Sequence, residues 1–102
     1  MSVQIINKDN FEEIISQGKP VLVDFYADWC GPCRMLSPIV EEIASERDDI
    51  IVGKVNVDRE EDLARRFNIY SIPSLIVFKD GEAVKQANGA RPKASILSLI
   101  DG

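Results

Sequence analysis

The chain has 102 residues, of which 45% are hydrophobic and 28% charged, and its formal net charge is −5 at pH 7. This length suits one domain, residues 1–102, whose core needs no disulfide or metal ion as a cross-link. The acidic balance, with scattered Lys and Arg, argues against binding to nucleic acid or to an anionic membrane surface, because phosphate binding needs a clustered basic face.

The first predicted elements are a short strand, residues 3–6, and a helix that runs through Ser16. Asp9 or Asn10 can cap this helix, because a glutamate follows three residues after each of them. Such a pair forms a capping box, in which each side chain accepts a hydrogen bond from the backbone of the other residue.

The middle of the chain alternates between strand and helix patterns. Residues 21–26 form an almost continuous apolar run, which is typical of a central strand that is covered on both faces. Apolar residues at helical spacing and then at strand spacing predict the elements that follow. These are a helix over residues 33–47, a strand over 51–57 and a helix over 60–67.

The end of the chain predicts a hairpin and a last helix. Residues 74–79 and 82–87 flank Asp80-Gly81, a strong turn dipeptide, and Pro92 fits the first turn of the final helix. The predicted order is βαβαβαββα. Parallel crossovers followed by a hairpin give an α/β protein, with a mixed central sheet and helices on both faces.

The two cysteines are three residues apart, where the strand over residues 21–26 gives way to a helix. Residues at this spacing share one face of a helical turn, so the sulfurs of Cys30 and Cys33 can bond or separate with little backbone movement. The helix N-terminus stabilises a thiolate, which is the nucleophile of disulfide exchange. We therefore expect Cys30, at the junction, to be the exposed attacking sulfur, and Cys33 to be the shielded resolving sulfur. Pro32 fits the first helical turn and stiffens the loop between them.

A zinc site or two buried structural cysteines are the alternatives for this pair. Structural zinc usually needs four ligands, mostly Cys and His, and the chain has no His and no further Cys. We expect no metal within the chain, and a metal or iron–sulfur site shared between subunits remains the alternative.

The sequence around the cysteines resembles the thioredoxin family. The run WCGPC over residues 29–33 follows VDFYA over residues 23–27, and the likeness covers nearly the whole chain. Other matching positions are Pro38, residues 54–58, 72–74 and 78–81, and Gly89. The resemblance implies a thioredoxin fold and an enzyme that reduces disulfides in partner proteins. Gly31 and Pro32 between the cysteines favour the reducing branch of the family.

The resemblance also implies supporting residues. Asp24, a carboxylate in an apolar strand, would lie beneath the cysteines and move a proton to and from Cys33, while Lys54 would lie near it. Burial would raise the pKa of Asp24. The bond before Pro73 would be cis and lie against the cysteines. The alternatives are a structural Asp24 bonded to backbone, a Lys54 on the solvated face, and a Pro73 that only begins a strand.

A flat apolar rim around Cys30 would bind substrate proteins. Its expected members are Trp29, Gly31, Pro32, Tyr70, Ile72, Pro73, Gly89 and Ala90. Packing in the core is the alternative for Trp29. The chain departs from the common family pattern with Tyr26 in place of Trp, Ser74 in place of Thr, and Asn88 in place of a small apolar residue, and these departures bear on which partners dock. The acidic runs over residues 58–62 and 41–46 fit solvated helix faces.

The chain has no glycine-rich nucleotide motif, so electrons must arrive from another protein. The resemblance implies recharging by a thioredoxin reductase, with electrons from NADPH through a flavoprotein, or by a ferredoxin-linked reductase. The redox-active disulfide would be the only redox group, and the expected partners are the reductase and disulfide-containing proteins. Without a signal-peptide pattern or a membrane-length apolar run, we expect a cytoplasmic protein. A monomer is a separate expectation. A glutathione-dependent or isomerase-like enzyme of the same fold, or a redox-independent binding module, are the rival interpretations.

Overall fold

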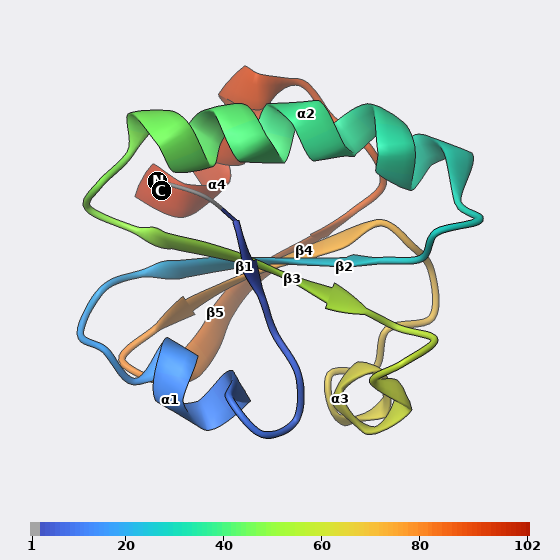
Figure 1. Cartoon of the computed structure of the whole chain (residues 1–102). Helices are drawn as coiled ribbons and strands as arrows, with labels where there is room; N and C mark the ends of the chain where they lie inside the picture. Colours follow the sequence, from blue (N-terminus) through green and yellow to red (C-terminus); the bar gives the residue numbers. More distant parts are fainter. Residues whose placement is uncertain (1–2) are drawn as a thin grey trace.

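The computed structural model describes residues 3–102, and within them a five-stranded sheet lies between two pairs of helices (Figure 1). The order βαβαβαββα is the predicted one. The elements are β1 (Gln4–Ile5), α1 (Phe11–Ile15), β2 (Val21–Tyr26), α2 (Gly31–Glu46), β3 (Ile51–Asn56), α3 (Glu61–Arg66), β4 (Ser74–Lys79), β5 (Glu82–Asn88) and α4 (Lys93–Asp101).

The strand order across the sheet is β1-β3-β2-β4-β5, which places β2 at the centre. β2 runs parallel to β3 and antiparallel to β4, and β4 pairs with β5 in an antiparallel hairpin. The turn between them has positive φ at Asp80 (54°) and Gly81 (81°), as a type I′ turn requires. The sheet is therefore mixed, as the pattern of crossovers and a final hairpin predicts.

Side chains of β2 alternate between two cores, because successive residues of a strand point to opposite faces. Val21, Val23 and Phe25 pack with residues of α1 and α3, whereas Leu22 packs with residues of α2 and α4. Figure 1 shows α2 and α4 on one side of the sheet and α1 and α3 on the other. By the same alternation, Asp24 shares the face of Leu22 and lies on the side of the sheet that α2 covers.

The predicted capping box of α1 is wrong in its residues. Asn10 occupies the N-cap position, but its side chain does not cap the helix. Instead, Asn7 Oδ1 accepts a hydrogen bond from the Asn10 N–H (2.9 Å), and Asn10 Oδ1 accepts one from the Asn7 N–H (2.8 Å). These reciprocal bonds resemble a capping box that begins at Asn7, and a second asparagine takes the role expected of a glutamate.

α2 begins at Gly31, two residues before the predicted start at Cys33, because Cys30 has an extended backbone and is the N-cap. Pro92 is likewise the N-cap of α4 rather than a residue of its first turn. Both prolines near helix starts, Pro32 and Pro92, lie where no intrahelical N–H donor is required. None of the helices within residues 3–102 has the length and apolar character needed to cross a bilayer.

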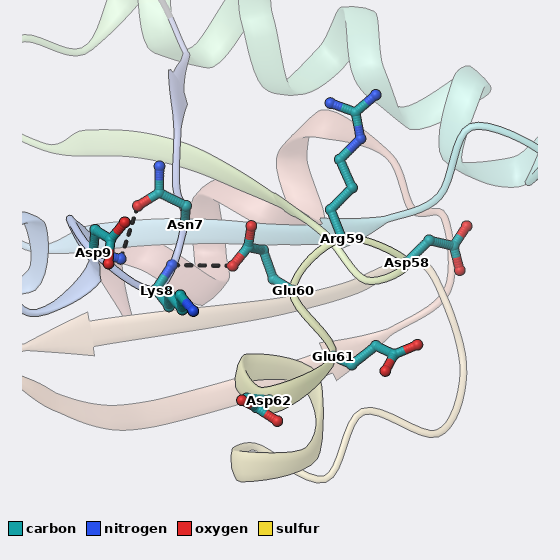
Figure 2. A pocket seen from close by; sticks show the side chains of 8 residues that line it. All are labelled: Asn7, Lys8, Asp9, Asp58, Arg59, Glu60, Glu61 and Asp62. Carbon is teal, nitrogen blue, oxygen red and sulfur yellow. Dashed lines mark hydrogen bonds between the residues drawn. The ribbon is translucent and has the colours of Figure 1, made fainter.

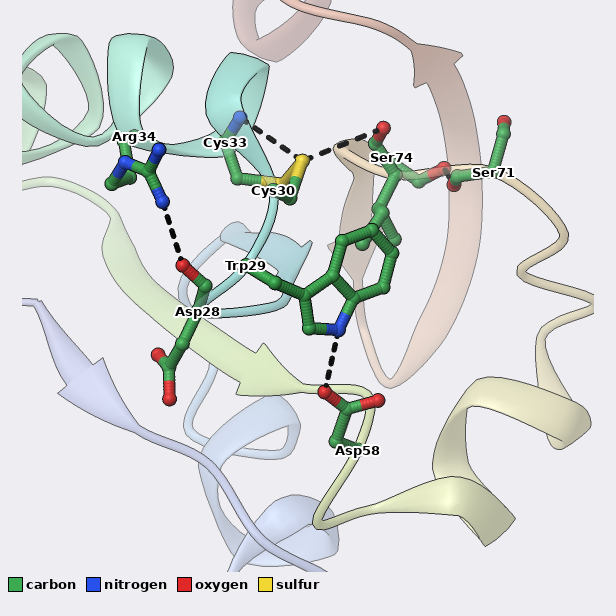
Figure 3. The surroundings of a disulfide bond; sticks show 9 residues. Asp28, Trp29, Cys30, Cys33, Arg34, Asp58, Ser71 and Ser74 are labelled. Carbon is green, nitrogen blue, oxygen red and sulfur yellow. Dashed lines mark hydrogen bonds between the residues drawn. A yellow bond between two sulfur atoms is a disulfide. The ribbon is translucent and has the colours of Figure 1, made fainter.

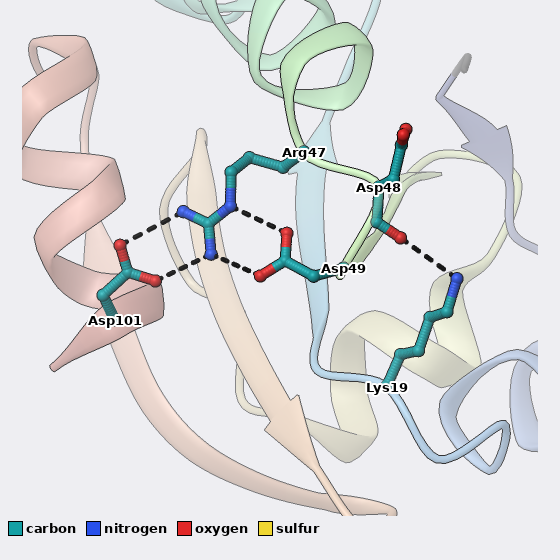
Figure 4. Close-up of polar contacts among 5 residues, drawn as sticks. All are labelled: Lys19, Arg47, Asp48, Asp49 and Asp101. Atoms are coloured by element: carbon teal, nitrogen blue, oxygen red, sulfur yellow. Dashed lines mark hydrogen bonds and ion pairs between the residues drawn. The ribbon is translucent and has the colours of Figure 1, made fainter.

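One arginine ties the end of α2 to the end of α4 (Figure 4). Arg47 Nε donates to Asp49 Oδ1 and Arg47 Nη2 to Asp101 Oδ1, both at 2.8 Å. The hydrogen bond from Arg47 is the main reason that the pKa of Asp49 falls to about 2. Nearby, Lys19 Nζ donates to the carbonyl oxygen of Asp48 at 3.1 Å. The helix that carries the cysteines is thus anchored at the end remote from them.

Gly53 of β3 lets β1 pack closely, and this predicts the effect of a methyl group there. A Cβ on Gly53 would lie 2.9 Å from Ile6 Cγ1, and Ile6 is fully buried. We expect Gly53→Ala to lower the free energy of unfolding by about 1–3 kcal/mol, as overpacked cores do. Urea unfolding would measure it. The same substitution should cost much less in an Ile6→Ala background, and an equal cost in both backgrounds would contradict the assigned contact.

Candidate active site

The two cysteines form a disulfide at the start of α2, and their Cα atoms are 5.2 Å apart. Cys30 is the N-cap, and its Sγ accepts a hydrogen bond from the Cys33 N–H at 3.2 Å (Figure 3). This N–H belongs to the first helical turn, where backbone donors lack partners within the helix. After reduction, the same donor and the helix dipole would stabilise negative charge on the Cys30 sulfur.

Cys30 is not exposed in this disulfide form, so that expectation is wrong. Its exposed fraction is 5%, close to the 3% of Cys33. Cys30 Sγ lies 3.9 Å from the carbonyl oxygen of Ile72, and half-buried Tyr26, Val57 and Ile72 pack around the pair. Cys30 is covered because the loop that contains Ile72, which is distant in sequence, lies against the strand-to-helix junction. A partner must therefore contact this loop to reach the sulfur.

A cavity of about 200 Å³ is lined by both Asp24 and Cys33, together with Arg34 and Lys54. The Asp24 side chain is buried, and within residues 3–102 its Oδ1 accepts no hydrogen bond. Burial raises the pKa of Asp24 to about 7, although the nearby positive charge of Lys54 lowers it. A carboxyl group that titrates near neutral pH therefore faces the same cavity as Cys33.

Lys54 lies beside Asp24 in the sheet, since the two residues are partners in the parallel register of β2 and β3. The side chain is half-buried, and its Nζ lies 5.2 Å from the centre of the Tyr26 ring. Lys54 is thus part of the cavity wall, and not only a residue of the solvated face. Its attraction to the aromatic face keeps a positive charge close to the buried carboxyl group.

The peptide bond between Ile72 and Pro73 is cis, as the family resemblance implied. Pro73 is buried, and its carbonyl oxygen accepts a hydrogen bond from the Gly89 N–H at 2.7 Å. Gly89 has a φ of +89°, a conformation that residues with side chains rarely adopt. This bond brings Gly89 and the exposed Ala90 to the loop that touches Cys30.

Trp29 and Tyr70 are the most exposed aromatic side chains beside the cysteines, at 69% and 91%. Core packing, the alternative for Trp29, is therefore excluded. Between them lies a hollow of about 160 Å³ that Val57, Ile69 and Ile72 help to line, so the surface is a shallow hollow and not a flat rim. Such an apolar surface is typical of a site that binds protein chains.

Sequence reasoning missed Asp58, which fixes Trp29. The indole Nε1 donates a hydrogen bond to Asp58 Oδ2 at 2.9 Å (Figure 3). Asp58 follows β3 as Trp29 follows β2, and the ends of neighbouring parallel strands lie at one edge of a sheet. That rule could have paired the two residues, because the strand over residues 21–26 was predicted correctly and the strand predicted over 51–57 is only one residue longer than β3. Val57 and Ile69 were also missed, because they line the hollow beside Trp29 only in the folded chain.

The acidic run over residues 58–62 lines a separate recess of about 560 Å³ together with Asn7, Lys8 and Asp9 (Figure 2). Glu60 Oε1 accepts a hydrogen bond from the Lys8 N–H at 3.0 Å, which ties this run to the segment after β1. Among the described residues, no group of three or more His, Cys, Asp or Glu side chains is placed to hold a metal ion. The hydrogen bond to Lys8 gives Glu60 a structural role in this recess.

Comparisons with known proteins agree on one family. The thioredoxin family model matches residues 2–102. The thioredoxin of Mycobacterium bovis is 47% identical over 97 residues, which cover 94% of this chain and 84% of that protein. The bifunctional thioredoxin reductase/thioredoxin of Mycobacterium leprae is 45% identical over 98 residues, covering 95% of this chain and 21% of that protein. Among solved structures, a mutant thioredoxin from Halobacterium salinarum has a TM-score of 0.92 at 37% identity, covering 98% of this chain and 88% of that one.

The buried Asp24 predicts a pH dependence of stability. Its folded pKa of about 7 exceeds the ordinary value of 3.8, so between these pH values the folded state keeps a proton that the unfolded state releases. Stability should therefore fall as pH rises through this window, by on the order of 4 kcal/mol at most. We expect Asp24→Asn to remove this loss.

Urea unfolding of the disulfide form at about pH 4.5 and pH 8 measures the effect. From pH 4.5 to pH 8 the native chain should lose stability and Asp24→Asn should not, so the free energy of unfolding of Asp24→Asn should rise relative to that of the native chain. Asp48→Asn, the same change at an exposed site, is the control and should show no such rise. Parallel pH profiles for the native chain and Asp24→Asn would contradict the prediction.

Proposed function

This chain belongs to the thioredoxin family and is a thiol–disulfide oxidoreductase, and we propose that Cys30 attacks the substrate disulfide, Cys33 resolves the mixed disulfide, and Asp24 carries the proton of Cys33. The observation that carries the proposal is the hydrogen bond from the Cys33 N–H to Cys30 Sγ at 3.2 Å. Among the hydrogen bonds within residues 3–102, it supplies a positioned donor to one sulfur only. That asymmetry supports Cys30 as the sulfur that ionises and attacks.

The reaction would proceed in two exchanges. The Cys30 thiolate attacks one sulfur of the substrate disulfide, that S–S bond breaks, and the released substrate sulfur takes up a proton. The Cys33 thiolate then attacks Cys30 Sγ, and the second substrate sulfur leaves as a thiolate and is protonated. Two electrons pass from the cysteine pair to the substrate, and the pair ends as the Cys30–Cys33 disulfide.

Asp24 is suited to the second exchange. Cys33 is buried and must lose its proton before it can attack, and Asp24 lines the same cavity. Because burial raises the pKa of Asp24 to about 7, its carboxylate can accept a proton near neutral pH and later return it. The adjacent charge of Lys54 keeps the carboxylate form accessible, so Lys54 would be a supporting residue.

Substrate proteins would dock on the surface around Cys30. Trp29, Tyr70 and Ile72 offer apolar contact there. The backbone next to the cis-Pro73 and at Gly89 and Ala90 would pair with an extended substrate segment, as an added strand does. Gly31 and Pro32 would set the spacing of the sulfurs and favour reduction of the substrate.

Electrons would come from a separate reductase. The Mycobacterium leprae relative joins a thioredoxin reductase and a thioredoxin in one protein. We propose that such an enzyme reduces the cysteine pair here and takes its electrons from NADPH through a flavin. A ferredoxin-linked reductase is the alternative electron source. A reducing cytoplasm is the compartment that suits this cycle, and a monomer would leave the docking surface free.

The roles of the two cysteines predict different trapping behaviour. The native chain should accelerate the reduction of insulin disulfides by dithiothreitol, and by NADPH with a thioredoxin reductase. Cys33→Ser should accumulate a disulfide between Cys30 and the substrate, because the resolving sulfur is absent. Non-reducing electrophoresis with mass spectrometry would detect it. Cys30→Ser and the double serine variant are the controls, and trapping by Cys30→Ser alone would reverse the roles.

The role of Asp24 predicts a defect in one step only. In Asp24→Asn, the second exchange should slow by about 100-fold near pH 7, the lower end of what a positioned general base contributes. The first exchange should stay nearly unchanged. Stopped-flow measurement of the two substrate thiols, released in sequence, separates these rates. Equal slowing of both steps, or of neither, would count against a proton transfer from Cys33 to Asp24.

A further inference from the structure

Two of the residues that depart from the common family pattern contact each other beside the active site. Ser74 begins β4 and Asn88 ends β5, and they are partners in the antiparallel register. The buried Ser74 Oγ lies 2.6 Å from the carbonyl oxygen of Ser71 and 3.0 Å from Asn88 Oδ1. Both contacts are within hydrogen-bond range, and they converge on one hydroxyl group.

The hydrogen count decides how the three groups bond. A hydroxyl group carries one hydrogen, and the shorter contact assigns it to the Ser71 carbonyl oxygen. In the structure Asn88 Oδ1 is the atom nearest Ser74, and one hydrogen cannot serve two acceptors. With the amide oxygen and nitrogen of Asn88 exchanged, its NH₂ group would donate to Ser74 while Ser74 donates to Ser71, and in this chain of bonds each would strengthen the next. Only a residue with a donor at position 88 completes this chain.

This chain of bonds closes the loop that touches the reactive sulfur. Ser71 and Ser74 flank Ile72 and Pro73, and the Ile72 carbonyl oxygen lies 3.9 Å from Cys30 Sγ. Figure 3 shows Ser71 and Ser74 on this loop beside the disulfide. The Ser74 side chain therefore joins the two ends of the loop through the Ser71 carbonyl oxygen, while the middle of the loop faces Cys30.

Hydrogen bonds from Gly89 and Arg91 hold the segment that follows β5. Gly89, next to Asn88, donates its N–H to the Pro73 carbonyl oxygen at 2.7 Å. Arg91 Nη2 donates to the Asn88 carbonyl oxygen at 3.2 Å, and Arg91 Nη1 to Ser95 Oγ at 3.1 Å. The Asn88 side chain thus contacts Ser74 at the end of the cis-proline loop, and its backbone leads directly into the Gly89–Ala90 segment. Asn88 therefore joins the loop to this segment.

We propose that Asn88 is a positioning residue: through Ser74 it fixes the Ile72–Pro73 backbone against which a protein disulfide docks. The inference rests on the proposed function, since it assumes that this backbone receives the substrate. A substrate protein pairs with the backbone and needs it in place, whereas a small disulfide needs only the sulfur of Cys30. Loss of the hydrogen bond between Asn88 and Ser74 should therefore weaken the docking of substrate proteins. Thiol–disulfide exchange with small disulfides should be unaffected.

The test compares four single variants with the native chain, and Ser74→Ala, alone and combined with Asn88→Ala, completes a double-mutant cycle. Asn88→Ala removes the donor, and Asn88→Asp replaces it by a group that only accepts. Gln86→Ala is the matched control: it removes an amide two residues earlier on β5, and the Gln86 side chain makes no hydrogen bond within residues 3–102. Ser74→Thr keeps the hydroxyl group. The readouts are kcat and KM for reduction of insulin, the rate with a small aromatic disulfide, and the melting temperature.

We expect Asn88→Ala to raise KM for insulin by about three- to tenfold, the effect of one neutral hydrogen bond, with kcat within about twofold. Asn88→Asp should raise it at least as much, and Gln86→Ala and Ser74→Thr should match the native chain. In a Ser74→Ala background, Asn88→Ala should add nothing, because its effect passes through Ser74. Rates with the small disulfide should stay unchanged throughout.

Other outcomes separate the inference from the proposed function. An unchanged KM in Asn88→Ala, or equal losses with insulin and the small disulfide, would overturn the role of Asn88 while the cysteine chemistry stands. Additive effects of the two alanine substitutions would show that Asn88 does not act through Ser74, and would also overturn it. Failure of the native chain to reduce insulin would instead remove the proposed function itself.

Discussion

The hydrogen bond from the Cys33 N–H to Cys30 Sγ is the contact on which the site depends. It requires an extended Cys30, a helix that begins at the next residue, and a strand that delivers the chain to that point. β2 meets the last requirement because it is the central strand and is buried on both faces. α2 keeps its orientation because Leu36 and Val40 are buried against the sheet. The core and the sulfur chemistry are therefore parts of one arrangement.

A second constraint is the carboxyl group in that core. Alternation along β2 places Asp24 under α2, where burial disfavours its charge, and Lys54 on the neighbouring strand only partly compensates. An apolar residue at this position would give a more stable protein. The chain keeps a group that is costly to fold, and the proposed proton transfer between Asp24 and Cys33 would give this group a chemical use.

The fold was largely predictable because its signals are local. The apolar run of β2, the turn at Asp80-Gly81 and the helical spacing in α2 each specify structure from neighbouring residues. What escaped prediction depends on contacts between distant segments. Ile72 covers Cys30, Asp58 holds the indole of Trp29, and Asn88 meets Ser74 across a strand pair. The departures at Ser74 and Asn88 were visible separately, but only the register of β4 and β5 shows that they are one feature.

Substitutions of Gly31 or Pro32, the two residues between the cysteines, would meet few atoms of the rest of the molecule. A Cβ placed on Gly31 would have no atom within 4 Å outside its immediate neighbours, and Pro32 is exposed. Changes at these positions alter the link between the cysteines without disturbing the sheet or its two cores. The dipeptide between the sulfurs can therefore vary while the sheet and the helices around it keep their packing, so the chemistry of the site and the stability of the fold can change independently.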